Sequence, residues 1–143
     1  MSIKVEFVLS SKELNVKEVD TIIDIHPSHT RTDFPPTSIA TPEWWIDVTE
    51  DSLSVDKTVW SVAKRLIGKK KKIVQICKQY HVIPTLIITV FSDYANRPEF
   101  GLSPRTVRFF SSLSTEIIVS LDSIYDQGMG TQDTVTAEDS VFC

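Results

Sequence analysis

Regular alternation of apolar and polar residues in three segments is the feature that most limits the possible folds of this chain. In residues 3–9, Lys4 and Glu6 fall on one face, and the other face carries Ile3, Val5, Phe7 and Leu9. Residues 44–49 and 117–125 repeat this pattern. A period of two is typical of a β-strand with one face in the core and the other in solvent. The chain is therefore expected to form a sheet with one buried face.

Helical segments separate the predicted strands. Residues 16–23 place apolar residues at helical spacing after Asn15, a favoured N-cap with Glu18 three residues further on. A later helical segment has Ser103 as its N-cap and Pro104 at its first position. Before that segment lies a nearly continuous apolar run, "TLIITVFS", which is typical of a central strand.

The long segment from about residue 55 to residue 80 is basic and helical. Its predicted apolar arc consists of Trp60, Ala63, Leu66, Ile67, Val74 and Cys77. Lys70 would point into this arc if the helix were continuous, and Gly68 lies just before it. The sequence therefore predicts either a break near Gly68 or a Lys70 side chain that bends out to solvent.

The resulting order, β-α-β-α(α)-β-α-β, predicts an α+β fold. We expect a two-layer sandwich in which three to four helices pack on a mainly antiparallel sheet of about four strands. Residues 1–126 are expected to form a single domain. Residues 127–143 are polar and acidic, and they are expected to form a flexible tail.

Size and composition disfavour several classes of protein. A chain of 143 residues with 41% hydrophobic content can bury one core. It has no apolar run near the roughly 20 residues that span a bilayer, so no membrane association is expected. The N-terminus lacks a signal pattern, and the two cysteines, Cys77 and Cys143, are expected to be free thiols. These features predict a cytoplasmic protein.

Charge is unevenly distributed along the chain. Residues 57–80 contain eight Lys and Arg residues and no acid, so a net charge of −4 leaves −12 on the remainder. Lys64, Lys71 and Lys78 recur every seven residues in a polar stripe, which can steer an acidic protein partner. Nucleic-acid binding through "KRLIGKKKK" is an alternative. It is disfavoured because the rest of the surface is acidic and no aromatic residues are interleaved with the lysines.

The polar loop "DIHPSHTRTDFPP" raises the question of a metal or catalytic site. His26, His29 and Asp33 are the candidate ligands, and a metal-assisted hydrolase built on them is the enzymatic alternative. Pro27 separates the two histidines, and no cysteine or third nearby histidine completes the set. We therefore interpret the loop as a solvated connection, and expect no metal, no cofactor and no catalytic residue in this chain.

Other catalytic signals are weak. The chain has only four glycines, whereas a phosphate-binding loop needs several close together. Asp47 and Asp122 are a candidate acid pair on one face of the sheet. We interpret both instead as outward-facing residues of separate strands.

Trp45 is the most informative single residue. If Trp44 and Ile46 face the helices, Trp45 must point to the opposite face of the sheet. If Trp45 is exposed on that face, it marks an interface. The alternative is that a second helix or the long loop covers it. The sequence leaves both alternatives open. The candidate partner-binding residues are therefore Trp45 and Asp47 together with Lys64, Lys71 and Lys78.

Several motifs, taken in order, resemble those of a bacterial family. The helix end "IDIHP" is similar to the family's Leu-Gly-Ile-x-Pro, and a charged loop then leads to the tryptophan-bearing strand "WWIDV". The closing stretch "GLSPRTVRFFSSLSTEIIVSLDSIY" looks like the family's ending. Over residues 3–126 the chain thus resembles the family catalogued as domain of unknown function 4279. One departure is the loop, which reads "HTRTDF" and lacks the glycine of the family's Lys-Gly.

This resemblance implies a small α/β protein with no established activity and no catalytic residues to carry over. Small cytoplasmic bacterial families of this sort frequently accompany toxin loci as immunity proteins. This analogy rests on the kind of family and not on any shared binding site. The favoured hypothesis is therefore a non-enzymatic protein-binding module, with toxin neutralisation as one role.

Overall fold

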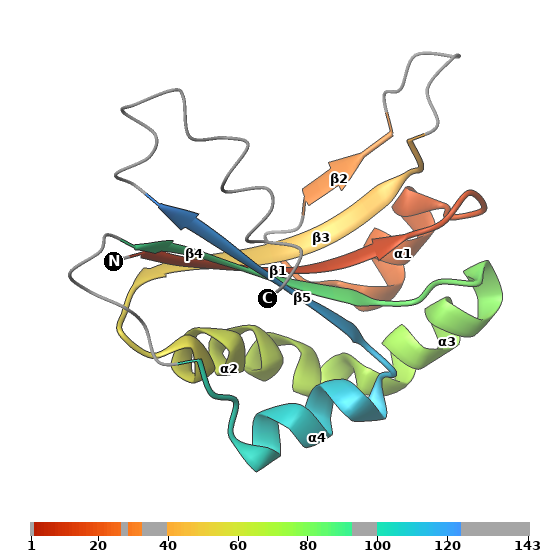
Figure 1. Ribbon diagram of the computed structural model, residues 1–143. Helices are drawn as coiled ribbons and strands as arrows, with labels where there is room; N and C mark the ends of the chain where they lie inside the picture. The colour runs from red at the N-terminus through yellow and green to blue at the C-terminus, as the bar shows by residue number, and fades with distance from the viewer. Residues whose placement is uncertain (1, 27–28, 33–39, 93–99, 124–143) are drawn as a thin grey trace.

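The computed structural model describes residues 2–26, 29–32, 40–92 and 100–123. Along the chain the elements are β1 (Ser2–Ser10), α1 (Val16–Ile23), β2 (His29–Arg31), β3 (Glu43–Asp51), α2 (Val55–Leu66), the short 3₁₀ helix η1 (Ile67–Lys69), α3 (Lys70–Tyr80), β4 (Thr85–Ser92), α4 (Pro104–Ser112) and β5 (Glu116–Ser123). The strands form one sheet in the order β2-β3-β1-β4-β5, and the helices lie on one side of it (Figure 1). The predicted α+β fold with two layers is confirmed.

The sheet differs from the expectation in two details. The described residues form five strands rather than about four, because residues 29–31 of the polar loop pair with β3 as the short strand β2. All three of these residues are exposed, so no apolar alternation indicated a strand. The sheet is also mixed, since β4 and β5 are parallel while the other pairs are antiparallel. A helix, α4, connects β4 to β5, as a parallel pair requires.

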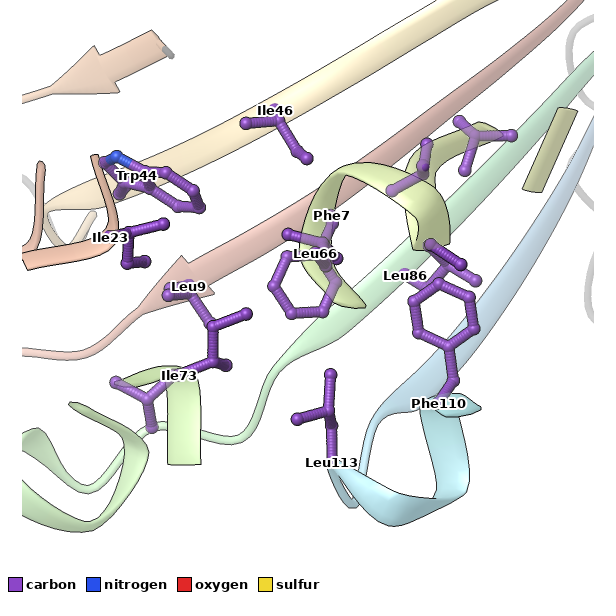
Figure 2. Close-up of a cluster of buried hydrophobic side chains, with 14 of the residues drawn as sticks. Phe7, Leu9, Ile23, Trp44, Ile46, Leu66, Ile73, Leu86, Phe110 and Leu113 are labelled. Carbon is purple, nitrogen blue, oxygen red and sulfur yellow. The ribbon is translucent and has the colours of Figure 1, made fainter. Parts of the chain in front are cut away.

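The core lies between the sheet and the helices, and β1 shows why. Its alternate residues are fully buried, whereas those between them are only partly buried. Figure 2 shows Phe7 and Leu9 of β1 among side chains from both layers, including Trp44, Leu66 and Phe110. The one-sided alternation seen in the sequence therefore corresponds to the sheet face on which the described helices pack.

The long basic segment is broken where the sequence predicted. α2 ends at Leu66, η1 spans Ile67–Lys69, and α3 begins at Lys70, whose side chain is exposed. A Cβ atom at Gly68 would meet nothing within 4 Å. The glycine is therefore not required by crowding, and its low helix propensity is the simpler reason for the break at this point.

The ends of the helices also agree with the sequence. The side chain of Asn15 accepts a hydrogen bond from the backbone N–H of Glu18 at 3.2 Å, as an N-cap does. α4 begins at Pro104, directly after Ser103. No helix among the described residues is both long and apolar enough to cross a membrane. The predicted tail, residues 127–143, lies outside the described residues.

Candidate functional site

The candidate metal ligands of the polar loop are only partly described. His26 is exposed after α1, His29 begins β2, and Asp33 lies outside the described residues. His29 Nε2 lies 3.5 Å from Asp47 Oδ1. Among the residues that the structure describes, no three His, Cys, Asp or Glu side chains are grouped so as to hold a metal ion. The three-residue site itself stays a prediction because of Asp33.

Trp45 lies on the sheet face opposite the helices. It is partly buried, and the imidazole ring of His29 stacks on it with a centroid distance of 5.4 Å. β2 therefore covers part of this tryptophan, which is an outcome between the two alternatives that the sequence left open. The ring still offers apolar area beside polar groups, a combination that is common at protein interfaces.

Carboxylates are adjacent to Trp45 on the same face. Asp47 is directly opposite Glu6 across the β1–β3 pair, and Lys4 Nζ lies 4.0 Å from Glu6 Oε2. All of these side chains are at least partly exposed, so their ion pairs contribute little to stability. We call Lys4, Glu6, His29, Trp45 and Asp47 the open-face cluster.

Asp122 does not join this cluster. Both Asp47 and Asp122 are on the open face, but β1 and β4 lie between their strands. Strands in a sheet are spaced about 4.8 Å apart, so the two aspartates are separated by roughly 14 Å across the sheet. The carboxylate that the sheet brings opposite Asp47 is Glu6 instead.

The other predicted partner-binding residues lie on the opposite side of the molecule. Lys64 on α2 and Lys71 and Lys78 on α3 are all exposed. These helices pack on the covered face of the sheet, whereas Trp45 and Asp47 are on the open face (Figure 1). The structure thus divides the five candidates into two separate surfaces, which one flat partner surface cannot contact together.

Positive charge on the helical side extends beyond the lysine stripe. Residues 57–80 contain eight Lys and Arg residues and no acid, and residues 100–115 add Arg105 and Arg108, again without an acid. α4, which carries these two arginines, packs against α2. We call the cations of α2, η1, α3 and α4 the basic layer.

A groove runs between α4 and the junction of α2 with η1 and α3. It is open to solvent and has a volume of about 750 Å³. Its lining includes three cations, Lys70, Arg105 and Arg108, and no acid. The guanidinium of Arg105 lies 4.1 Å from the centroid of the Trp60 ring, within the range of a cation–π interaction. The groove therefore combines an aromatic surface with a positive rim.

The groove corrects part of the predicted apolar arc. Ile67 was expected to face the core but is 48% exposed, whereas Trp60 packs against the core while remaining partly exposed, and both side chains line the groove. The break at η1 changes the direction of the chain at Ile67, so one helical wheel drawn through both helices misplaces it. Sequence reasoning missed the groove because the position of α4 beside α2 is a tertiary contact. The one sequence feature that could have indicated the groove was the stretch 100–115, which contains Arg105 and Arg108 and no acid.

Asp56 connects α4 to α2 and so helps to position the groove. Its Oδ1 accepts a hydrogen bond of 2.8 Å from the backbone N–H of Ser103. Burial acts to raise the pKa of this carboxyl. The hydrogen bonds from Ser103 and Thr106, together with the charge of Arg105, outweigh burial and leave the pKa below its ordinary value.

Cys77 has no features of a nucleophile. It is a partly buried free thiol on α3, and burial raises its pKa to about 11. The thiol is therefore protonated at neutral pH, while the reactive species of a cysteine is the thiolate. Cys143 lies outside the described residues.

Comparison with known proteins places this architecture in a family. No curated protein and no solved structure matches the chain. A family model described as "Domain of unknown function (DUF4279)" matches residues 1–123, which is the span from β1 to the end of β5. The chain therefore belongs to the family of domain of unknown function 4279.

Proposed function

We propose that this protein is a non-enzymatic protein-binding module whose basic layer binds an acidic protein. The observation that carries the proposal is the groove between α4 and the α2–α3 junction, where three cations and two aromatic rings line one open surface without an acid.

The chemistry of the groove fits a protein surface with both apolar and acidic side chains. Trp60 and Phe109 offer apolar contact area, and tryptophan and arginine are the residue types most enriched where single side chains dominate a binding energy. An arginine stacked on an aromatic ring directs its N–H groups outward in the plane of the guanidinium, toward carboxylates. The guanidinium carbon of Arg105 lies over the Trp60 ring, 4.1 Å from its centroid.

The charge of the basic layer would act before contact is made. Ten Lys and Arg residues with no acid among them, in residues 57–80 and 100–115, create a positive potential on one side of a chain whose net charge is −4. Such a potential accelerates the encounter with a negatively charged partner and orients it. Because exposed charges are screened by salt, this acceleration should weaken as ionic strength rises.

The biological role that we propose is neutralisation of an acidic toxin in the bacterial cytoplasm. It is supported by the analogy between this family and small bacterial families that accompany toxin loci, and by the positive groove, which is suited to an acidic target.

The experiment compares three single variants in affinity capture from native cell lysate, read by mass spectrometry. The captured protein is then purified and its Kd for each variant is measured at low and moderate salt. Arg108→Glu should weaken binding at least tenfold, because it reverses a charge in the groove. Lys17→Glu makes the same change of charge on an exposed position of α1 and should alter the Kd less than twofold.

The third variant, Trp45→Ala, separates the two surfaces. If Trp45→Ala abolishes capture while Arg108→Glu leaves the Kd unchanged, the open-face cluster is the binding surface and the groove is not. Equal Kd values for wild type, Arg108→Glu and Lys17→Glu would likewise contradict binding through the groove.

A further inference from the structure

The strand β5, at one end of the sheet, is unusually apolar and unusually exposed. Ile117, Ile118, Val119 and Leu121 are 39%, 44%, 40% and 44% exposed. β5 pairs with β4 on one side, and within the described ranges no strand pairs with its other side. An apolar strand with a free edge readily pairs with another strand.

The direction of the backbone groups on β5 follows from one hydrogen bond. The N–H of Glu116 donates to the carbonyl oxygen of Pro84, which precedes β4, at 2.9 Å. Because successive residues of a strand direct their N–H and C=O groups to opposite sides, those of Ile117, Val119 and Leu121 point away from β4. The same three residues carry exposed apolar side chains, so main-chain and apolar contacts are offered together.

β2, at the other end of the sheet, lacks these features. It has only three residues, all of them exposed, and two of these, His29 and Arg31, have basic side chains. Short length and charge are common protections of an edge against pairing. β5 has eight residues with no proline, lysine or arginine. Only one of these two edges, β5, is therefore suited to strand addition.

We propose that β5 is a self-association site, at which a second copy of this chain adds its own β5 in antiparallel orientation. Two five-stranded sheets then join across a two-fold axis, and each copy supplies the same residues to the interface. This is strand addition to a free edge, with main-chain hydrogen bonds for affinity and side chains for register.

The sequence of β5 allows an antiparallel register in which no like charges lie directly opposite one another. With the two-fold axis at Ser120, Val119 lies opposite Leu121 of the second copy, and Asp122 lies opposite Ile118 of the second copy. Val119 and Leu121 of each copy then form two apolar pairs on the helical side. An axis at Val119 would instead place Glu116 opposite Asp122, and like charges directly opposite one another are destabilising. Of these two registers we assign the one centred on Ser120, and the cross-link described below tests it.

The first test measures the mass of the full chain by sedimentation from micromolar to millimolar concentration. The wild type should reach twice the chain mass of 16.2 kDa. Val119→Lys should remain at 16.2 kDa, because a lysine on the edge opposes pairing. Leu53→Lys, at a residue that is 69% exposed between β3 and α2, is the matched control and should dimerise like the wild type.

Circular dichroism spectra of Val119→Lys and Leu53→Lys should match that of the wild type, as a control that both variants are folded. A wild type that stays at 16.2 kDa over the whole range would overturn the proposal, whatever else covers β5.

The second test is a cross-link that does not depend on a destabilising variant. In the assigned register, Ser120 faces its own copy as a non-hydrogen-bonded pair, with Cα atoms about 4.5 Å apart. That separation lies within the range of about 4.4–6.8 Å for a disulfide. Ser120→Cys in a Cys143→Ser background should therefore form a disulfide-linked dimer under mild oxidation. Cys77 should contribute little, since its raised pKa keeps it protonated.

Thr89→Cys in the same background is the matched control. Thr89 is the register partner of Ser120 on β4 and is partly buried like it, but it lies one strand further from the edge. It should remain monomeric on a non-reducing gel. Equal cross-linking of the two variants would overturn the assignment of the interface to β5, and no cross-linking of Ser120→Cys would overturn the register centred on Ser120.

Discussion

Trp44 and Trp45 are adjacent in β3 and lie on opposite faces of the sheet. Trp44 is fully buried in the core and its indole N–H donates to Asp20 Oδ1 at 3.1 Å. Trp45 is partly buried and is covered in part by the ring of His29. The comparison shows that residue type does not determine the role of a side chain here. The role depends on which face of the sheet the position occupies, because the described helices all lie on one face (Figure 1).

The two faces also differ in how their side chains are held. On the covered face the apolar side chains of strands and helices interlock, as in Figure 2. On the open face Trp45 and its neighbours interact across strands through stacking and exposed ion pairs. Cross-strand pairs contribute roughly 0.2–1 kcal/mol each, far less than a buried large side chain. Burial therefore holds the side chains of the covered face, whereas weaker cross-strand contacts hold those of the open-face cluster.

The largest effect is expected for Trp44→Ala. Removing a fully buried indole leaves a cavity and removes its hydrogen bond to Asp20, and should lower the free energy of unfolding by about 3–5 kcal/mol. Urea denaturation measures it. A loss no greater than that of Trp45→Ala would contradict the distinction between the two faces.

Trp45→Ala should cost less, about 1 kcal/mol, because this ring loses only a cross-strand stack and partial burial. His29→Ala should remove part of the same contact, so the costs of the two substitutions should not add in the double variant. Additive costs in urea denaturation would show that His29 and Trp45 do not interact.

A carboxylate on the helical side should make stability depend on pH. The pKa of Asp56 is lower in the folded chain than its ordinary value of 3.8. Its contribution is therefore present above that value and is lost as the pH falls through the lowered pKa. Asp56→Asn should lower the Tm at pH 7, and the difference from wild type should shrink in acid.

Asp47→Asn is the control on the open face for the pH experiment. Asp47 is partly exposed and 3.5 Å from His29, so its removal should change the Tm at pH 7 less than removal of Asp56 does. A larger effect of Asp47→Asn would mean that the open-face cluster, rather than the α2–α4 contact, carries the electrostatic stability.

The smallest effect on stability is expected for Arg108→Glu. Arg108 is exposed on α4, and surface substitutions usually change the free energy of unfolding by less than about 0.5 kcal/mol. Its unfolding curve should coincide with that of the wild type even where partner binding is lost. A large loss of stability would mean that the groove is part of the structural core rather than a binding surface.

Local patterns in the sequence predicted much of the fold. Alternation located the covered face, Asn15 and Pro104 marked helix starts, and the conflict between Lys70 and the apolar arc located the break at η1. Each of these features depends on residues close together in the chain, which is why a single sequence reveals them.

What the sequence did not predict depends on which elements become neighbours. Ile117, Val119 and Leu121 alternate as core residues do, yet they are exposed because β5 lies at the end of the sheet. Strand position is decided by pairing with distant segments, and alternation does not encode it. For the same reason the placement of Trp45 opposite the lysine stripe, and the groove formed by α4, required the structure.

The central place of β1 has a consequence for synthesis on the ribosome. Both of its neighbours are made later: β3 ends at Asp51 and β4 at Ser92. At roughly 5–20 residues per second, β1 waits on the order of 4–16 seconds before β4 has been made. During that time its apolar residues have no completed sheet to join. The nascent chain should therefore be a good substrate for chaperones until its second half has emerged.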